Sequence, residues 1–219
     1  MGVIFDLDGT LIDSISMHAK YLKMALDKFE FGNRIPYSFV KKNIRVSFSA
    51  FCKILSSYYK IKIDENLMRD IIKIKDEIMV KEGIKNLRMF SYSRETIKFL
   101  LKKKVNVCIA SSINSFELKL VYRKIKLDKL GVDIINSNNF KLEKPNPYIL
   151  NESINRYKMN IKNTCYVGDS VTDAITAKRA GISFIGVYNK ELSNKGLFFR
   201  NMKEVYNYFN KNYYLYYDS

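Results

Sequence analysis

The stretch VIFDLDGTL at residues 3–11 places two aspartates two positions apart, directly after a short apolar run. The apolar residues predict a buried strand, which the following Gly-Thr pair ends. At this spacing Asp6 and Asp8 point to the same side of a sheet. In a doubly wound α/β fold, ligands bind at the carboxyl ends of the strands. With both aspartates close to one metal ion, one could attack a substrate and the other could transfer a proton. The plainer alternative is a surface turn that contains two aspartates.

The rest of the chain predicts an α/β fold, because strand-like and helix-like segments alternate after about residue 90. The predicted strands lie at residues 105–110, 132–135, 164–167 and 183–187, and the predicted helices at 95–103, 116–125, 147–157 and 172–180. The strands are continuous apolar runs, which are typical of parallel sheets buried on both faces. The alternation predicts a mostly parallel, doubly wound sheet with helices on both faces.

Residues 14–85 differ from the rest, because they show helical periodicity and little strand signal. Helices are expected at residues 17–29, 39–44, 49–58 and 66–80. We expect a small all-helical domain, inserted after the first strand, that emerges above the aspartate pair as a mobile cap. The alternative is that these helices pack on the sheet as part of one domain.

Composition restricts the choice of partners. The 219 residues are 47% hydrophobic with a formal net charge of +16. They contain no apolar run of about 18 residues, so no membrane partner is expected. The charge raises nucleic acid as a partner, but the lysines are spread along the chain and this interpretation is disfavoured. A positive field would also attract an anionic substrate. The cysteines, Cys52, Cys108 and Cys165, lack metal-like spacing, so we expect buried free thiols and a cytoplasmic location. A monomer is expected by default, because no pattern in the sequence indicates an oligomeric state.

Two further motifs supply groups that can hold phosphate. Ser111 and Ser112 end the predicted strand 105–110, where hydroxyl and backbone N–H groups can bind phosphate oxygens. Such a serine pair also commonly forms a turn or a helix cap. In the segment KPNP, residues 144–147, the prolines restrict the backbone and Lys144 would project one fixed cation. Such a cation can hold a phosphate and offset its repulsion from an attacking carboxylate.

The segment GDSVTD at residues 168–173 again follows an apolar strand and supplies two acids, Asp169 and Asp173. Oxygen ligands suit Mg²⁺, which binds through one or two carboxylates together with a substrate phosphate. The sequence therefore predicts that Mg²⁺ is the cofactor.

The ordered set of these motifs resembles the haloacid dehalogenase superfamily of phosphohydrolases, and the resemblance spans essentially the whole chain. It implies a Rossmann-like catalytic core at residues 1–13 and 86–219. The helical insert at residues 14–85 would be the cap that marks the branch containing phosphoglycolate phosphatases and β-phosphoglucomutases. Ser91-Tyr92-Ser93 stands where relatives often carry Pro-Gly, so the junction departs from the family pattern.

The resemblance also implies roles for the site residues. Asp6 would attack phosphorus and form an aspartyl-phosphate. Asp8 would protonate the leaving oxygen and then activate the hydrolytic water. An aspartate at position 8 argues against dehalogenation. Ser111, with Ser112 beside it, and Lys144 would bind the transferring phosphoryl group.

The metal ligands are likewise implied by the resemblance. Mg²⁺ would lie between Asp6, the backbone carbonyl of Asp8, and Asp169. Asp173 is expected to hold a metal-bound water or Lys144 rather than the metal itself. The metal and the lysine would neutralise charge on the equatorial phosphoryl oxygens.

The function expected from this resemblance is Mg²⁺-dependent hydrolysis of a small phosphomonoester metabolite of the sugar phosphate or phosphoglycolate type. A β-phosphoglucomutase-type mutase is the alternative, because it shares every catalytic residue. Gly168-Asp169 resembles the phosphatase form, whereas His18 falls where sugar-phosphate members often carry a hinge histidine. His18 could equally be a helix-surface or hinge residue without chemistry.

Two cap residues, Arg45 and Lys75, are candidates for contact with the distal end of the substrate. Solvated helix faces are the favoured interpretation for both. A non-catalytic or nucleic-acid-binding protein is the alternative from another class. It is disfavoured because a degenerate relative would have lost an acid or Lys144, and none is lost here.

Overall fold

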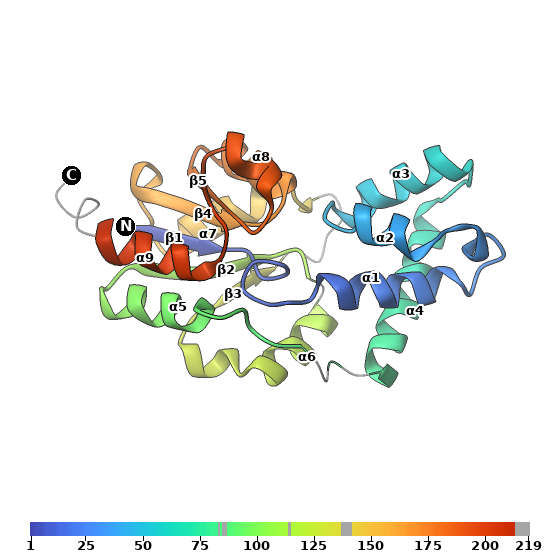
Figure 1. Ribbon diagram of the computed structural model, residues 1–219, viewed down its shortest axis with the longest axis horizontal. Coiled ribbons are helices and arrows are strands. Elements are labelled where there is room, and N and C mark those ends of the chain that lie inside the picture. The colour runs from blue at the N-terminus through green and yellow to red at the C-terminus, as the bar shows by residue number, and fades with distance from the viewer. Residues whose placement is uncertain (83, 85–86, 114, 137–141, 213–219) are drawn as a thin grey trace. The chain divides into compact units, whose positions relative to one another are not determined.

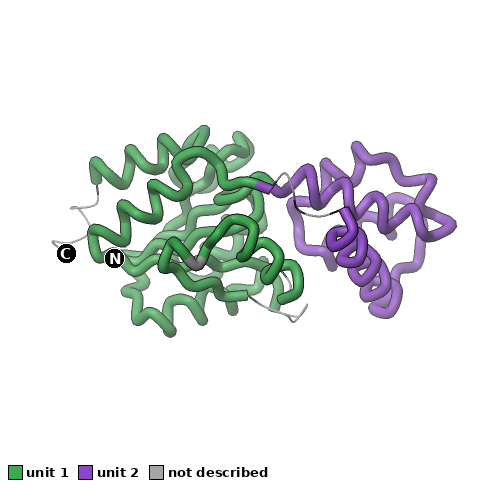
Figure 2. The backbone as a smooth tube through the Cα atoms, turned by 90° about the horizontal axis from the view of Figure 1, so that it is seen from below, with its two compact units in different colours: residues 1–13, 88–219 green, residues 14–87 purple. Residues whose placement is uncertain are grey.

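The computed structural model describes residues 1–82, 84, 87–113, 115–136 and 142–212 (Figure 1). The chain folds into two compact units (Figure 2). The first unit combines Met1–Asp13 with Arg88–Ser219, and the second is Ser14–Leu87. Among the helices in the described ranges, none is long and apolar enough to span a membrane.

The first unit is built on one six-stranded parallel sheet in the order β3-β2-β1-β4-β5-β6. The strands are β1 (Gly2–Phe5), β2 (Asn106–Ser111), β3 (Ile134–Asn136), β4 (Thr164–Gly168), β5 (Ser183–Val187) and β6 (Leu197–Phe199). The predicted α/β fold is therefore confirmed. The chain first adds β2 and β3 on one side of β1, and then adds β4, β5 and β6 on the other side. This reversal makes the edge between β1 and β4 a topological switch point, where α/β proteins bind ligands.

Within the described part of this unit, five α-helices accompany the sheet: α5 (Ser93–Lys102), α6 (Ser115–Ile125), α7 (Tyr148–Arg156), α8 (Val171–Ala180) and α9 (Met202–Asn212). Figure 1 shows α8 on one side of the strands and α5 with α6 on the other. Short 3-10 turns lie at η2 (Leu127–Leu130), η4 (Ile161–Asn163) and η5 (Lys190–Asn194). Ile4, Cys108 and Tyr166 lie in one buried cluster with apolar residues of α7 and α8. Because these three are register partners on neighbouring strands, they share one face of the sheet.

The structure adds one strand, β6, to those that the sequence predicts. β6 has only three residues at the edge of the sheet, and Leu197 is 49% exposed. Its apolar run is confined to the three residues between Gly196 and Arg200, too few to distinguish a strand from a loop, whereas the equally short β3 overlaps the longer predicted strand at 132–135.

The cysteines are free and buried, as expected. Burial raises the pKa of Cys108 and of Cys165 to about 12. Both thiols therefore remain protonated near neutral pH, which makes them poor nucleophiles.

The second unit is helical throughout its described elements: α1 (Ile15–Leu26), η1 (Gly32–Arg34), α2 (Tyr37–Asn43), α3 (Phe48–Tyr59) and α4 (Glu65–Glu82). It has its own apolar core, in which Leu22, Phe51 and Ile71 are almost completely buried. Side chains cap two of its helices. Ser47 accepts a hydrogen bond from the Ala50 N–H at the start of α3, and Asp64 accepts one from the Leu67 N–H at the start of α4.

Candidate active site

Asp6 lies immediately after β1, at the switch point of the sheet. Its backbone N–H donates to the carbonyl of Val167 in β4 (2.8 Å), and the residue is only 4% exposed. The chain then turns tightly, because the carbonyl of Leu7 accepts from the N–H of Leu11 (2.9 Å). This turn keeps the Asp6 carboxylate at the sheet edge while the chain leaves toward the second unit.

Gly9 is required within this turn for two reasons. Its φ is +82°, a conformation that other residues rarely adopt. A Cβ atom at Gly9 would also lie 2.5 Å from Oδ2 of Asp169. The absence of a side chain therefore allows the Asp169 carboxylate to approach the loop that carries Asp6 and Asp8.

Lys144 provides the positive charge of the site. Its Nζ lies 2.6 Å from Oδ1 of Asp6, 2.7 Å from Oδ1 of Asp173 and 3.0 Å from the hydroxyl of Tyr166. An ammonium group has three N–H donors, so these acceptors can use all of them. Lys144 is only 9% exposed, and such a buried charge is stable only when it is paired in this way.

The ionisation of Lys144 and of Asp6 depends on burial and on neighbouring charges. Burial alone would lower the pKa of Lys144, but the carboxylates of Asp173 and Asp6 hold it well above its usual range. Burial raises the pKa of Asp6 to about 7, against the lowering effect of Lys144, and Asp173 and Asp8 add to the rise. A second cation beside Asp6 would favour its charged form.

Asp173 is fixed by the helix that carries it. Ser170 is the N-cap of α8, and Asp173 completes a capping box with it. Oδ2 of Asp173 accepts from the N–H of Ser170 (3.0 Å), which leaves Oδ1 for Lys144 and Tyr166. Gly168 allows the Asp173 side chain to lie against the end of β4, because a Cβ atom at position 168 would lie 2.6 Å from the Cβ of Asp173.

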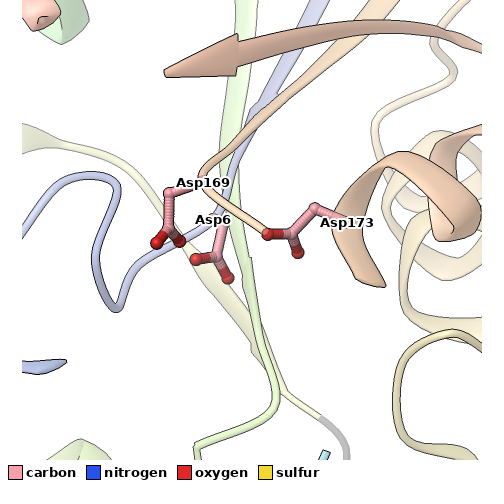
Figure 3. A group of neighbouring side chains, drawn as sticks. All are labelled: Asp6, Asp169 and Asp173. Atoms are coloured by element: carbon pink, nitrogen blue, oxygen red, sulfur yellow. The ribbon is translucent and has the colours of Figure 1, made fainter. Parts of the chain in front are cut away.

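A group of buried carboxylates at this edge could hold a metal ion. Asp6, Asp169 and Asp173 each offer an oxygen within 4.8 Å of the others. Figure 3 shows the Asp6 and Asp169 carboxyl groups side by side, with Asp173 pointing toward them. The Thr10 hydroxyl lies 3.3 Å from both Oδ2 of Asp6 and Oδ1 of Asp169, so these two oxygens face the same point. Both Asp173 oxygens already accept hydrogen bonds from the lysine and the helix cap. Asp6 and Asp169 therefore fit a hard cation such as Mg²⁺ better than Asp173 does.

The remaining core candidates lie at the same edge of the sheet. Asp8 is half-buried and close enough to Asp6 for its charge to raise the pKa of that group. Ser111 ends β2, and its buried hydroxyl accepts from the N–H of Ile113 (3.2 Å). Ser112 follows it and is half-buried. Since the Ser111 hydroxyl also stabilises a turn, its binding of phosphate stays a prediction.

The candidates from the predicted cap all lie in the second unit. His18 is a buried residue of α1, Arg45 is exposed between α2 and α3, and Lys75 is a half-buried residue of α4. Their contact with a substrate stays a prediction.

Sequence reasoning missed Tyr166 and Thr10 as members of this cluster. Tyr166 lies inside the apolar run of β4, where the pattern indicates only a buried strand. One signal was available, because the hydroxyl of a buried tyrosine usually needs a hydrogen-bond partner. Thr10 belongs to the opening motif, but nothing local indicated that its hydroxyl lies between Asp6 and Asp169.

Comparison with known proteins shows the same fold elsewhere. A hydrolase from Pseudomonas syringae superposes with a TM-score of 0.81 at 22% identity, over 96% of this chain and 98% of that one. A β-phosphoglucomutase from Clostridium difficile superposes with a TM-score of 0.75 at 18% identity, over 100% and 99% of the two chains. At these identities the likeness shows the fold alone.

Sequence comparison agrees with this result. A phosphoglycolate phosphatase from Vibrio parahaemolyticus is 24% identical over 84% of this chain and 82% of its own. The family model for haloacid dehalogenase-like hydrolases matches residues 3–187, which include the loop of Asp6, the lysine and both later aspartates. Because this match covers most of the chain, the protein belongs to the haloacid dehalogenase-like hydrolases.

Proposed function

We propose that the protein is a Mg²⁺-dependent phosphatase that hydrolyses a small phosphomonoester through an aspartyl-phosphate on Asp6. One observation carries this proposal above all. The buried Asp6 carboxylate lies 2.6 Å from a buried lysine, at the switch point of the sheet. A carboxylate that attacks an anionic phosphate needs such a cation to offset the repulsion between them.

In the first step, Oδ1 of Asp6 forms a bond to phosphorus while the bond from phosphorus to the ester oxygen breaks. We assign the attack to Oδ1 because Oδ2 faces Asp169 across Thr10 and would serve the metal. Asp8 donates its proton to the departing ester oxygen, which leaves as an alcohol.

In the second step, the ionised Asp8 accepts a proton from water, and the water oxygen forms a bond to phosphorus. The bond between phosphorus and Asp6 breaks, which restores the carboxylate and releases inorganic phosphate. Lys144 binds phosphoryl oxygens through both steps, and Asp173 holds the lysine in position. Ser111 and Ser112 complete the phosphate site.

Mg²⁺ would be held by Asp6, the backbone carbonyl of Asp8, and Asp169. When bound, it supplies positive charge that neutralises the phosphoryl oxygens. We also propose that the first unit is the catalytic core and the second, residues 14–87, is the cap. His18, Arg45 and Lys75 are its candidate substrate contacts.

The substrate class proposed is a sugar phosphate or a phosphoglycolate-type metabolite. The similarity to phosphoglycolate phosphatases supports it. The net charge of +16 is compatible with an anionic substrate, which a positive field would attract.

Phosphate release from a panel of phosphorylated metabolites, with Mg²⁺ and with EDTA, tests this function. We expect the rate of phosphate release from one substrate to be well above the others. EDTA should lower this rate by about 100-fold or more, because a bound metal stabilises the charge of the transition state by several kcal/mol. Conversion of β-glucose 1-phosphate to the 6-phosphate without release would identify a mutase. No release from any substrate, together with binding to DNA or RNA that weakens with salt, would overturn the enzyme assignment.

A further inference from the structure

Tyr166 combines a core position with a polar contact at the site. It is the largest fully buried side chain among the described residues. Its ring lies in the cluster beneath α7 and α8, with its centroid 6.5 Å from that of Phe184. Its hydroxyl points toward the carboxyl edge of the sheet, where it meets Lys144, Asp173 and the carbonyl of Ala110.

The hydroxyl has a specific place in the hydrogen-bond network. It accepts from Nζ of Lys144 at 3.0 Å and can donate its single proton to Oδ1 of Asp173, also at 3.0 Å. Oδ1 of Asp6 and the carbonyl of Ala110 are more distant, both at 3.5 Å. Tyr166 therefore connects the lysine to the aspartate that caps α8.

This arrangement matters because the acceptors of Lys144 do not remain equivalent during the proposed reaction. Oδ1 of Asp6 becomes bonded to phosphorus in the first step and loses most of its negative charge. Asp173 and Tyr166 keep their chemical state throughout. They can hold two N–H groups of Lys144 while the third turns to a phosphoryl oxygen.

We propose that Tyr166 is a positioning residue whose hydroxyl, together with Asp173, fixes Nζ of Lys144 for phosphoryl transfer. This inference rests on the proposed function, because it requires Lys144 to bind the phosphoryl group. The ring of Tyr166 fills the core, but the hydroxyl orients the cation. The two roles are separable because phenylalanine keeps the ring and removes only the oxygen.

Tyr166→Phe is expected to lower kcat for the preferred phosphomonoester by about tenfold or more, the usual effect of losing a hydrogen bond to a charged group. Tyr157→Phe is the matched control, because the Tyr157 hydroxyl also bonds a carboxylate, that of Asp133, which lies outside the site. We expect this control to keep wild-type kcat. In a protein that already carries Lys144→Met, Tyr166→Phe should cost less than about twofold, because the hydroxyl acts through the lysine.

A second measurement does not depend on turnover. Competitive acetylation of the folded protein, read by mass spectrometry, should label Lys144 several-fold faster in Tyr166→Phe, since its amine has lost one of three hydrogen bonds. Surface lysines such as Lys162 provide the internal reference, and Tyr157→Phe should label as wild type does. Wild-type kcat in Tyr166→Phe, or a lowered kcat with unchanged labelling of Lys144, would overturn the proposal. A wild-type protein that hydrolyses no phosphomonoester would overturn the proposed function instead, and the labelling alone would decide whether Tyr166 holds the lysine.

Discussion

Asp6→Asn is expected to lower phosphatase turnover by about 10⁴-fold or more, the scale seen when a catalytic nucleophile is removed. The amide has nearly the same shape as the carboxylate but cannot form an acyl phosphate. It would also supply one fewer negative oxygen to the metal. The measurement is kcat on the preferred phosphomonoester at saturating Mg²⁺.

The same substitution should leave the free energy of unfolding unchanged or increase it. Burial raises the pKa of Asp6 to about 7, which means that keeping this group charged destabilises the folded state. Asp133→Asn, at an exposed position outside the site, is the matched control and should keep wild-type kcat. Turnover above a few per cent of wild type in a folded Asp6→Asn protein would contradict the assignment of the nucleophile.

Lys144→Met is expected to lower kcat/KM by about 10³-fold, because removal of one preorganised charge from a phosphoryl or oxyanion site has costs of this order. It should also reduce the free energy of unfolding by about 3 kcal/mol, the cost of breaking a buried ion pair by removing one partner. Asp6 and Asp173 would then face each other without the cation that lies 2.6 and 2.7 Å from them. Steady-state kinetics and urea denaturation measure the two effects.

Lys178→Met is the matched control for this substitution. Lys178 lies on α8 as Asp173 does, but its side chain is exposed. We expect it to change neither kcat/KM nor stability by a measurable amount. Wild-type kcat/KM in a folded Lys144→Met protein would show that the lysine has no part in binding the phosphoryl group.

Much of the fold could be predicted because its strands carry strong local signals. β1, β2, β4 and β5 are apolar runs bounded by turn residues, and Asp6, Ser111 and Asp169 lie at the carboxyl ends of the first three. Since parallel strands end at one edge, residues as distant in sequence as Asp6 and Asp173 are expected to meet. The structure brings both of them to Lys144. β6 lacks such a signal, because its apolar run is only three residues long.

The role of Tyr166 could not be predicted, because it depends on atoms from other parts of the chain. Its hydroxyl matters only because α8 brings Asp173, and the segment before α7 brings Lys144, to the same point. A tyrosine within an apolar strand is most simply interpreted as core. In retrospect, Tyr166 is the register partner of Ile4, which stands two residues before Asp6, so the tyrosine shares a face of the sheet with Asp6.

Fluorine NMR of the protein with beryllium fluoride and Mg²⁺ most directly tests whether Asp6 carries the phosphoryl group. Trifluoroberyllate on a carboxylate has the shape and charge of an acyl phosphate, and it binds at equilibrium, so no reaction intermediate has to accumulate. We predict protein-bound fluorine resonances in the wild-type protein and in Asp133→Asn that disappear in EDTA and in Asp6→Asn. A wild-type spectrum without bound resonances, or bound resonances that persist in Asp6→Asn, would contradict the mechanism.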